Sequence, residues 1–194
     1  MGDVINCTRL LSRVDNVVPL PLEPAKIPRI PLISFAYRSG CLLDIFGEKT
    51  SEQHMINALN QTIYHWKQQG ISIDMCDFTT YPKLDECPSR YVIFLELNKE
   101  EQGNSGVEND YQQLQSMVSN DVERELCEVN HIYKQIRNSN QIGSIVCILV
   151  RNGTFSTFLH KELITDQISP IQVKPHRLLK TKHHIEFFYD RRLL

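Results

Sequence analysis

Two neighbouring segments decide the fold: ISIDMCDFTTY at 71–81 and RYVIFLELN at 90–98, separated by a polar turn that contains Pro82 and Pro88. Both segments are rich in β-branched and aromatic residues, which favour extended strands. Their lengths suit strands of a small sheet. We therefore expect two strands that pair with each other.

A helix is expected on each side of this strand pair. Residues 51–69 carry Met55, Ile56, Leu59, Ile63 and Trp66 at helical spacing. Thr50 with Gln53 fits a capping box before that helix, and Gly70 supplies its end. The second helix carries one apolar stripe, with a break expected near Ser119–Asn120; its members are Tyr111, Leu114, Val118, Val122, Leu126, Val129, Tyr133 and Ile136.

The remaining elements complete an α+β pattern. SIVCILV at 144–150 predicts a short strand, Asn152–Gly153 a turn, residues 155–163 a short helix, and HHIEFFYDRRLL at 183–194 a further helix. From residue 41 the order is strand, helix, strand, strand, helix, strand, helix. This order predicts a small mixed sheet packed with helices.

A proline-rich stretch near the N-terminus predicts a boundary between two parts of the chain. Residues 32–38 alternate in polarity, and CLLDIF at 41–46 follows Ser39–Gly40, which predicts a hairpin-like pair of strands. VVPLPLEPAKIPRIP at 17–31 contains five prolines. Proline fixes φ and removes an amide donor, so this stretch predicts an extended linker.

Length and composition set the class of protein. The chain has 194 residues, a mass of 22.6 kDa and a net charge of −2, which suit one domain or slightly more and give no overall reason to expect a nucleic-acid or membrane partner. Neither a membrane span nor a secretion signal is recognisable, so we expect a cytoplasmic protein. Six single cysteines without zinc spacing predict reduced, mostly buried thiols and no metal site.

Known catalytic motifs are absent from this sequence. It contains no phosphate-binding glycine loop, no G-x-S-x-G and no H-E-x-x-H, and His183–His184 is expected to be solvated surface. The segment from Lys174 to Arg192 has six basic and two acidic side chains, a local excess of +4. Such a segment can bind an anion, although runs of like charge are usually only solvent-exposed surface.

Six short pieces, taken in order along the chain, resemble the C-terminal third of the Gretchen Hagen family of auxin-responsive acyl-acid amido synthetases, and most resemble the animal proteins that carry this domain. The pieces are Gly2–Asp3–Val4, FAYRSGCLLDIFGEKTSE (35–52), VNHIYKQIR (129–137), Ile142–Gly143, Gly153–Thr154–Phe155 and Val173–Lys174–Pro175–His176–Arg177. No single piece is specific, but their order along nearly the whole chain makes coincidence improbable.

The resemblance implies an adenylate-forming ligase that uses ATP, with Mg, to join a carboxylic acid to an amino acid. It implies that residues 1–40 belong to a large N-terminal domain with a proline-rich insert, that 41–50 form a hinge, and that 51–194 form the C-terminal domain of an adenylate-forming enzyme. Family members close the small domain over a site that lies mainly in the large one.

The resemblance also implies roles for four residues. Asp3 would accept hydrogen bonds from the nucleotide ribose, Arg38 and Lys49 would place positive charge near the nucleotide and the hinge, and catalytic Lys174 would approach the α-phosphate. Without the resemblance, Asp3 is an exposed terminal aspartate and Arg38 and Lys49 are ordinary strand-end charges. The family writes lysine, any residue, proline, arginine, whereas here Pro175 follows Lys174 directly and His176 stands where proline is expected.

Two functions therefore remain open. In the first, the chain is a fragment or shortened product of an acid–amino acid ligase and is inactive alone, because the phosphate loop and acyl pocket are not in it; no cofactor is then expected for this chain by itself. In the second, it is a non-catalytic interaction module that keeps the fold. Nucleic-acid binding is disfavoured because Trp66 and the other aromatics lie on core stripes, away from the basic segment.

Overall fold

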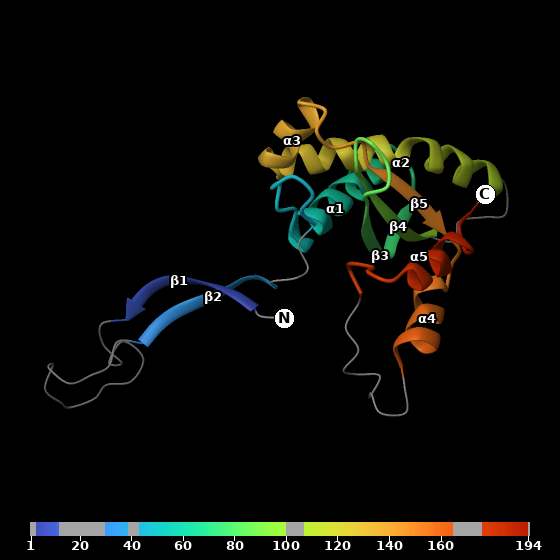
Figure 1. The fold of residues 1–194 in the computed structure, drawn as a ribbon. Coiled ribbons are helices and arrows are strands. Elements are labelled where there is room, and N and C mark those ends of the chain that lie inside the picture. The colour runs from blue at the N-terminus through green and yellow to red at the C-terminus, as the bar shows by residue number, and fades with distance from the viewer. Residues whose placement is uncertain (1–2, 12–29, 39–42, 100–106, 165–175, 194) are drawn as a thin grey trace, which may run out of the picture. The chain divides into compact units, whose positions relative to one another are not determined.

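A three-stranded sheet organises the larger part of the protein (Figure 1). The computed structural model describes residues 3–11, 30–38, 43–99, 107–164 and 176–193. By contacts the chain divides into two compact units, Met1–Leu42 and Leu43–Leu194, which are described separately below.

The sheet has the strand order β3–β4–β5 and is mixed, as the sequence predicts. Its strands are β3 (Ile73–Lys83), β4 (Arg90–Lys99) and β5 (Val146–Val150). β3 and β4 are antiparallel, with Tyr81 opposite Val92, and β5 runs parallel to β4. The expected pairing of the two segments is confirmed. A parallel pair needs a crossover, which helices α2 and α3 supply.

Helices α1 (Glu52–Gln68) and α2 (Val107–Val129) cover the first face of the sheet (Figure 1). Trp66 and Leu59 of α1 and Val118 of α2 are buried against Ile93 and Leu95 of β4 in one core. The indole nitrogen of Trp66 donates to Asp121 of α2 over 2.8 Å, which joins the two helices. The apolar stripes seen in the sequence are therefore the inner faces of these helices.

The second face of the sheet is covered by elements from the end of the chain. These are α4 (Thr154–Phe158), its continuation η2 (Leu159–Leu163) and α5 (Lys182–Tyr189). Phe94 of β4 stacks on Phe188 of α5 with ring centroids 5.2 Å apart, and Phe158 lies 4.9 Å from Phe188. Because β4 is covered on both faces, its sequence is apolar without alternation from Tyr91 to Leu95.

Helix α1 begins one residue later than the sequence predicts. Its N-cap is Ser51, whose hydroxyl accepts a hydrogen bond from the His54 amide over 3.2 Å, and His54 takes the place of the usual glutamate in the capping box. Thr50 is instead buried, and its backbone pairs with that of Leu43. Gln53 bonds to Asn57 on the exposed side of the helix.

The long helical pattern breaks at Asn130 and not near Ser119–Asn120. α2 ends at Val129 and α3 (His131–Asn138) begins after Asn130, whose side chain accepts a hydrogen bond from the Tyr133 amide over 3.1 Å. Ser119 lies within α2, where its hydroxyl accepts from the backbone amide of Cys147 in β5. The polar pair at 119–120 is thus compatible with an uninterrupted helix.

The N-terminal unit contains one antiparallel pair, β1 (Asp3–Leu11) with β2 (Ile30–Arg38). The predicted hairpin between 32–38 and 41–46 is wrong, because β2 pairs with β1 and residues 43–46 form no strand beyond the single bridge from Leu43. Most of the proline-rich stretch lies outside the described residues.

The four cysteines whose side chains the structure describes are free thiols, but the prediction that most cysteines are buried is wrong for these four. Cys147 is buried and Cys127 half-buried, whereas Cys76 and Cys87 are exposed. Among the described helices, none combines the length and apolar character that a membrane span requires.

We expect Asn130→Ala to lower the free energy of unfolding by about 2–3 kcal/mol. The change removes the N-cap of α3. It also removes the side-chain amide that donates to the carbonyl of Glu48 over 3.1 Å, so this buried carbonyl loses a hydrogen bond. Urea denaturation measures the loss. Asn138→Ala, at an exposed position near the end of α3, is the control, and equal losses in both variants would contradict this assignment.

Candidate functional site

The predicted site residues fall in three places. Asp3 and Arg38 lie directly opposite each other in the register of β1 and β2. Lys49 belongs to the larger unit, and the structure describes its exposed position. Lys174 lies outside the described residues. The structure thus brings Asp3 and Arg38 together in the N-terminal unit and leaves the predicted role of Lys174 untested.

Lys49 projects from a closed loop of residues 43–50. The buried carboxylate of Glu48 accepts hydrogen bonds from the amides of Ile45 and Phe46, each over 2.8 Å. The backbones of Leu43 and Thr50 close the loop with two hydrogen bonds of 2.8 Å. Lys49 itself has φ 46°, a left-handed conformation that is costly for a residue with a side chain. Its neighbours hold it in this conformation while its ammonium group faces solvent.

Two pieces of the family resemblance meet in this loop. The Asn130 side chain donates to the carbonyl of Glu48 and to the hydroxyl of Thr50, both over 3.1 Å. The loop comes from the piece at 35–52 and Asn130 from the piece at 129–137. These two pieces, far apart in the sequence, are therefore joined by a buried contact.

Two further pieces also have structural roles. At Gly143 a Cβ atom would lie 3.0 Å from the carbonyl oxygen of Pro88, so a larger residue would force the backbone to shift. Gly153 has φ 80°, and its amide donates to the buried carboxylate of Glu96 over 2.8 Å, as the Phe155 amide does over 2.9 Å. Glu96 of β4 thereby binds the N-terminus of α4 to the sheet.

Arg177, the last residue of the sixth piece, is bound to two elements of the larger unit. Its Nε donates to Glu52 of α1 over 3.2 Å, and its Nη1 donates to the Asp77 carboxylate and to the carbonyl of Phe78 in β3. Its carbonyl accepts from the amide and hydroxyl of Thr80, over 3.0 and 2.8 Å. Sequence reasoning named Arg177 only as part of a motif and missed Glu52 and Asp77 as its partners.

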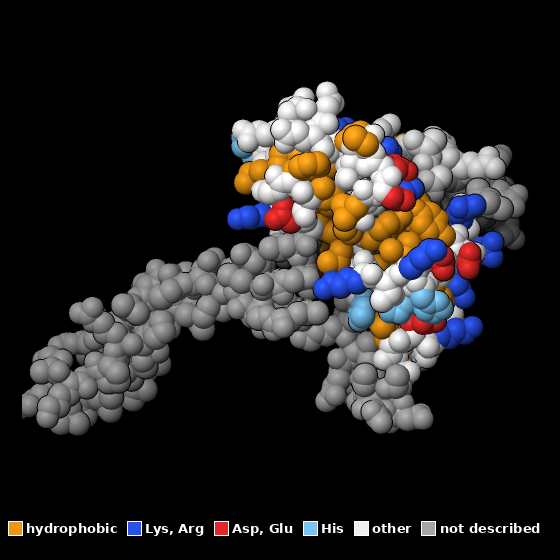
Figure 2. All heavy atoms as spheres, in the orientation of Figure 1, with side chains coloured by type: hydrophobic (Ala, Val, Ile, Leu, Met, Phe, Trp, Pro, Cys, Tyr) orange, Lys and Arg blue, Asp and Glu red, His pale blue; other side chains and the backbone are white. Residues whose placement is uncertain are grey.

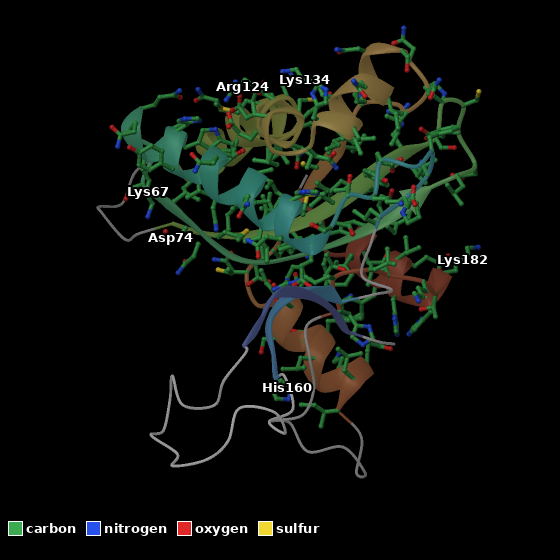
Figure 3. The ribbon with its side chains drawn as sticks, turned by 90° about the vertical axis from the view of Figure 1, so that its left-hand side faces the viewer. Lys67, Asp74, Arg124, Lys134, His160 and Lys182 are labelled. Carbon is green, nitrogen blue, oxygen red and sulfur yellow. The ribbon has the colours of Figure 1, made fainter. Side chains whose placement is uncertain are left out.

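The basic segment is not a uniform cationic surface. Arg177 is paired as described, and the guanidinium of Arg191 lies 3.6 Å from the ring centroid of Phe187. Lys182, whose side chain is 89% exposed, pairs loosely with Glu186. Figure 3 shows its side chain projecting away from the ribbon. The positive charge available to an outside anion in the described part of this segment is thus smaller than the sequence excess suggests.

Three histidines gather over the α4–α5 end of the molecule, where Figure 2 shows them in pale blue beside acidic side chains. Nε2 of His183 lies 3.0 Å from the Glu162 carboxylate, and the His184 ring lies 5.0 Å from that of Phe158. His183 is exposed as expected, whereas the expectation is wrong for His184, which is packed. Burial and then the neighbouring His184 lower the pKa of His176.

Within the described residues, no group of three or more histidine, cysteine or acidic side chains has the geometry to hold a metal ion. Surface pairs elsewhere are ordinary salt bridges. Figure 3 shows one of them, Lys67 of α1 beside Asp74 of β3, with Nζ and Oδ1 2.5 Å apart.

Comparison with known proteins decides the family. The sequence profile of the GH3 family C-terminal domain matches residues 53–183, well over half of the chain. The chain belongs to the GH3 family. The predicted family is thereby confirmed, and so is the fold class.

Two curated GH3 relatives from Arabidopsis thaliana illustrate the similarity. The chain is 28% identical over 165 residues to indole-3-acetic acid-amido synthetase GH3.17, an alignment that covers 84% of this chain and 26% of the relative. It is 27% identical over 157 residues to 4-substituted benzoates-glutamate ligase GH3.12, covering 78% and 26%. The chain thus spans about a quarter of the length of these relatives.

Solved GH3 structures share the fold. The structure of GH3.15 acyl acid amido synthetase superposes with a TM-score of 0.66 at 21% identity, over 84% of this chain and 28% of that chain. A structure of the Arabidopsis protein in complex with 2,4-DB gives a TM-score of 0.65 at 20% identity over the same shares. These likenesses establish the architecture of a GH3 C-terminal domain.

The capping box of α1 makes stability depend on pH. Nδ1 of His54 accepts a hydrogen bond from the Ser51 amide over 3.3 Å, and burial lowers the pKa of His54. Between the lowered folded pKa and the ordinary value near 6.5, the unfolded chain binds the proton and the folded chain does not. Stability contributed by neutral His54 is therefore present at pH 7.5 and lost as the pH falls through this window.

We expect His54→Gln to lose less stability than the unmodified chain between pH 7.5 and pH 5, because glutamine keeps a capping acceptor and does not titrate. Urea unfolding at both pH values measures the difference. Comparing the two proteins cancels the contribution of the other histidines to the pH dependence of stability. An identical fall in both would contradict the role of His54.

Proposed function

We propose that this chain supplies the C-terminal domain of an ATP-dependent ligase that joins a carboxylic acid to an amino acid. The observation that carries the proposal is the family match over residues 53–183. Relatives with amido synthetase and glutamate ligase activities in their names support it. The acid and the amine are left open, because the alignments cover about a quarter of those relatives.

In the proposed reaction the substrate carboxylate attacks the α-phosphorus of ATP and releases pyrophosphate. The amine then attacks the acyl carbon of the adenylate and releases AMP. ATP supplies the activation of the acid. A cationic group near the α-phosphate offsets the negative charge that builds up in the first transition state.

Four residues of this chain are the ones that we assign to such a site. Asp3 and Arg38 are opposite each other on paired strands, so a carboxylate for the ribose hydroxyls and a cation for the phosphates come from one backbone framework. Lys49 adds an exposed cation on a closed loop in the predicted hinge at 41–50. Lys174 is the proposed catalytic cation, and Mg is the proposed companion of the nucleotide.

These 194 residues contain no phosphate-binding glycine loop. We therefore propose that the chain by itself does not turn over, because a few contacts supply neither nucleotide affinity nor the proximity that acyl transfer needs. A cytoplasmic location stays a prediction from the sequence.

The test uses a protein that joins this sequence to the large N-terminal domain of a GH3 enzyme. With ATP, Mg and a panel of carboxylic acids, acid-dependent release of pyrophosphate is expected. Lys174→Ala should slow that release by a factor on the order of 10² to 10³. Lys180→Ala, an exposed lysine of the same basic segment, is the control.

Three results separate the possibilities. Turnover by the 194-residue chain alone would contradict the proposal that it lacks a complete site. A joined protein that folds but releases no pyrophosphate with any acid would favour a non-catalytic interaction module. Equal rates for the Lys174→Ala and Lys180→Ala variants would remove Lys174 from the catalytic role.

A further inference from the structure

The turn between β5 and α4 contains Asn152–Gly153, the single Asn–Gly pair in the sequence. Both residues are exposed to solvent. Gly153 has φ 80°, a conformation that residues with a side chain rarely adopt, so the turn favours glycine at this position. The fold therefore places an asparagine directly before a residue whose amide nitrogen is not shielded by a side chain of its own.

An asparagine before a glycine is open to a reaction with the backbone that follows it. The glycine amide nitrogen gives up its proton to solvent and attacks the side-chain carbonyl carbon of the asparagine. The bond from that carbon to the side-chain nitrogen breaks, and the leaving nitrogen takes up a proton and departs as ammonia. Water then opens the resulting succinimide ring to aspartate or isoaspartate. The rate therefore depends on how freely the glycine nitrogen can lose its proton and approach the asparagine side chain.

In this protein a buried carboxylate holds the attacking nitrogen. The Gly153 amide donates to one oxygen of Glu96 over 2.8 Å, and the Phe155 amide donates to the other over 2.9 Å. Glu96 lies in the central strand β4 and is 6% exposed. An amide that donates to such a carboxylate keeps its proton, because the nitrogen anion would form beside a second negative charge in a poorly solvated place.

Further hydrogen bonds hold the turn on both sides of the pair. The carbonyl of Arg151 accepts from the amide and the hydroxyl of Thr154, over 3.2 and 2.6 Å. The carbonyl of Gly153 accepts from the amide and the hydroxyl of Thr157, over 2.9 and 2.7 Å. Ring closure brings the Gly153 nitrogen into covalent contact with the Asn152 side chain, a movement that these bonds oppose.

We propose that Asn152 is a deamidation site whose rate is controlled by Glu96. The carboxylate protects the pair while α4 is in place, and Asn152 is modified when the start of α4 opens. Opening a short helix at the surface costs less free energy than unfolding a core strand, so the reaction does not require the whole domain to unfold. An isoaspartate at position 152 adds one carbon to the main chain of the turn and would displace the Gly153 amide from Glu96. This proposal does not depend on the ligase assignment.

The test follows deamidation of Asn152 in the full chain by peptide mass mapping at mildly alkaline pH. Glu96→Gln keeps the size of the side chain but offers one acceptor oxygen to two amides. Asn152 should therefore deamidate on the order of tenfold faster in this variant than in the unmodified chain. Asn130→Ala, which weakens the fold at the junction of α2 and α3, is the control and should leave the rate within about twofold.

A second measurement needs no variant. The Gly153 amide should exchange its hydrogen on the order of tenfold more slowly in the folded chain than in a peptide of residues 149–156, and deamidation of Asn152 should be slowed by a similar factor. Equal rates in the chain and the peptide would overturn the proposal, even if Glu96→Gln does not fold.

The results with the variants can also contradict the proposal. An unchanged rate in folded Glu96→Gln would show that the carboxylate does not protect the pair. A slower rate would show that Glu96 acts as the base that removes the amide proton. Equal acceleration in Glu96→Gln and Asn130→Ala would show that global stability sets the rate, and each of these three results overturns the role of Glu96.

Discussion

The need to cover both faces of strand β4 is the constraint on which the larger unit depends. β4 is the central strand, with Ile93 and Leu95 buried on one side and Phe94 on the other. Helices α1 and α2 cover the first face, and the second is covered only when α4 and α5 are both in place. Burial of an aromatic side chain contributes roughly 1.5–3 kcal/mol, so the phenylalanines of the second face make the return of residues 176–193 strongly favourable.

Buried carboxylate and amide side chains then fix the positions of the loop and helices that pack on the sheet. Glu48 closes the loop that presents Lys49, Asn130 ties that loop to the junction of α2 and α3, and Glu96 binds the start of α4. Each of these groups is buried and hydrogen-bonded, which is the condition under which a polar group can be kept inside a protein. The short pieces shared with the GH3 family coincide with several of these contacts.

The sequence was sufficient for the elements whose periodicity is strong. The strand pair at 71–98, the helix at 51–69, the short strand before Asn152 and the C-terminal helix are confirmed, because the apolar residues of each form a face that is buried in the core. Local sequence patterns did not predict the features that are set by contacts between residues far apart in the sequence. The break after α2 is set by the bonds of Asn130 to the loop at 43–50, and β2 pairs with β1 across the intervening linker.

The candidate site was predictable only in part. The residues assigned by resemblance include Asp3 and Arg38, which the strand register places opposite each other, although their spacing of 35 residues gives no such indication. The partners of Arg177 were not predictable, because Glu52 and Asp77 look like ordinary surface acids in the sequence and acquire their meaning only from the packing of α1 beside β3.

Native-state hydrogen exchange tests most directly whether the end of the chain is integral to the sheet. We expect the amides of Phe94 in β4 and Phe188 in α5 to open with the same free energy, and Phe188→Ala to lower both by the same amount. If the amides of α5 open at a much lower free energy, and Phe188→Ala leaves β4 unchanged, the second face does not depend on the returning segment and the account is contradicted.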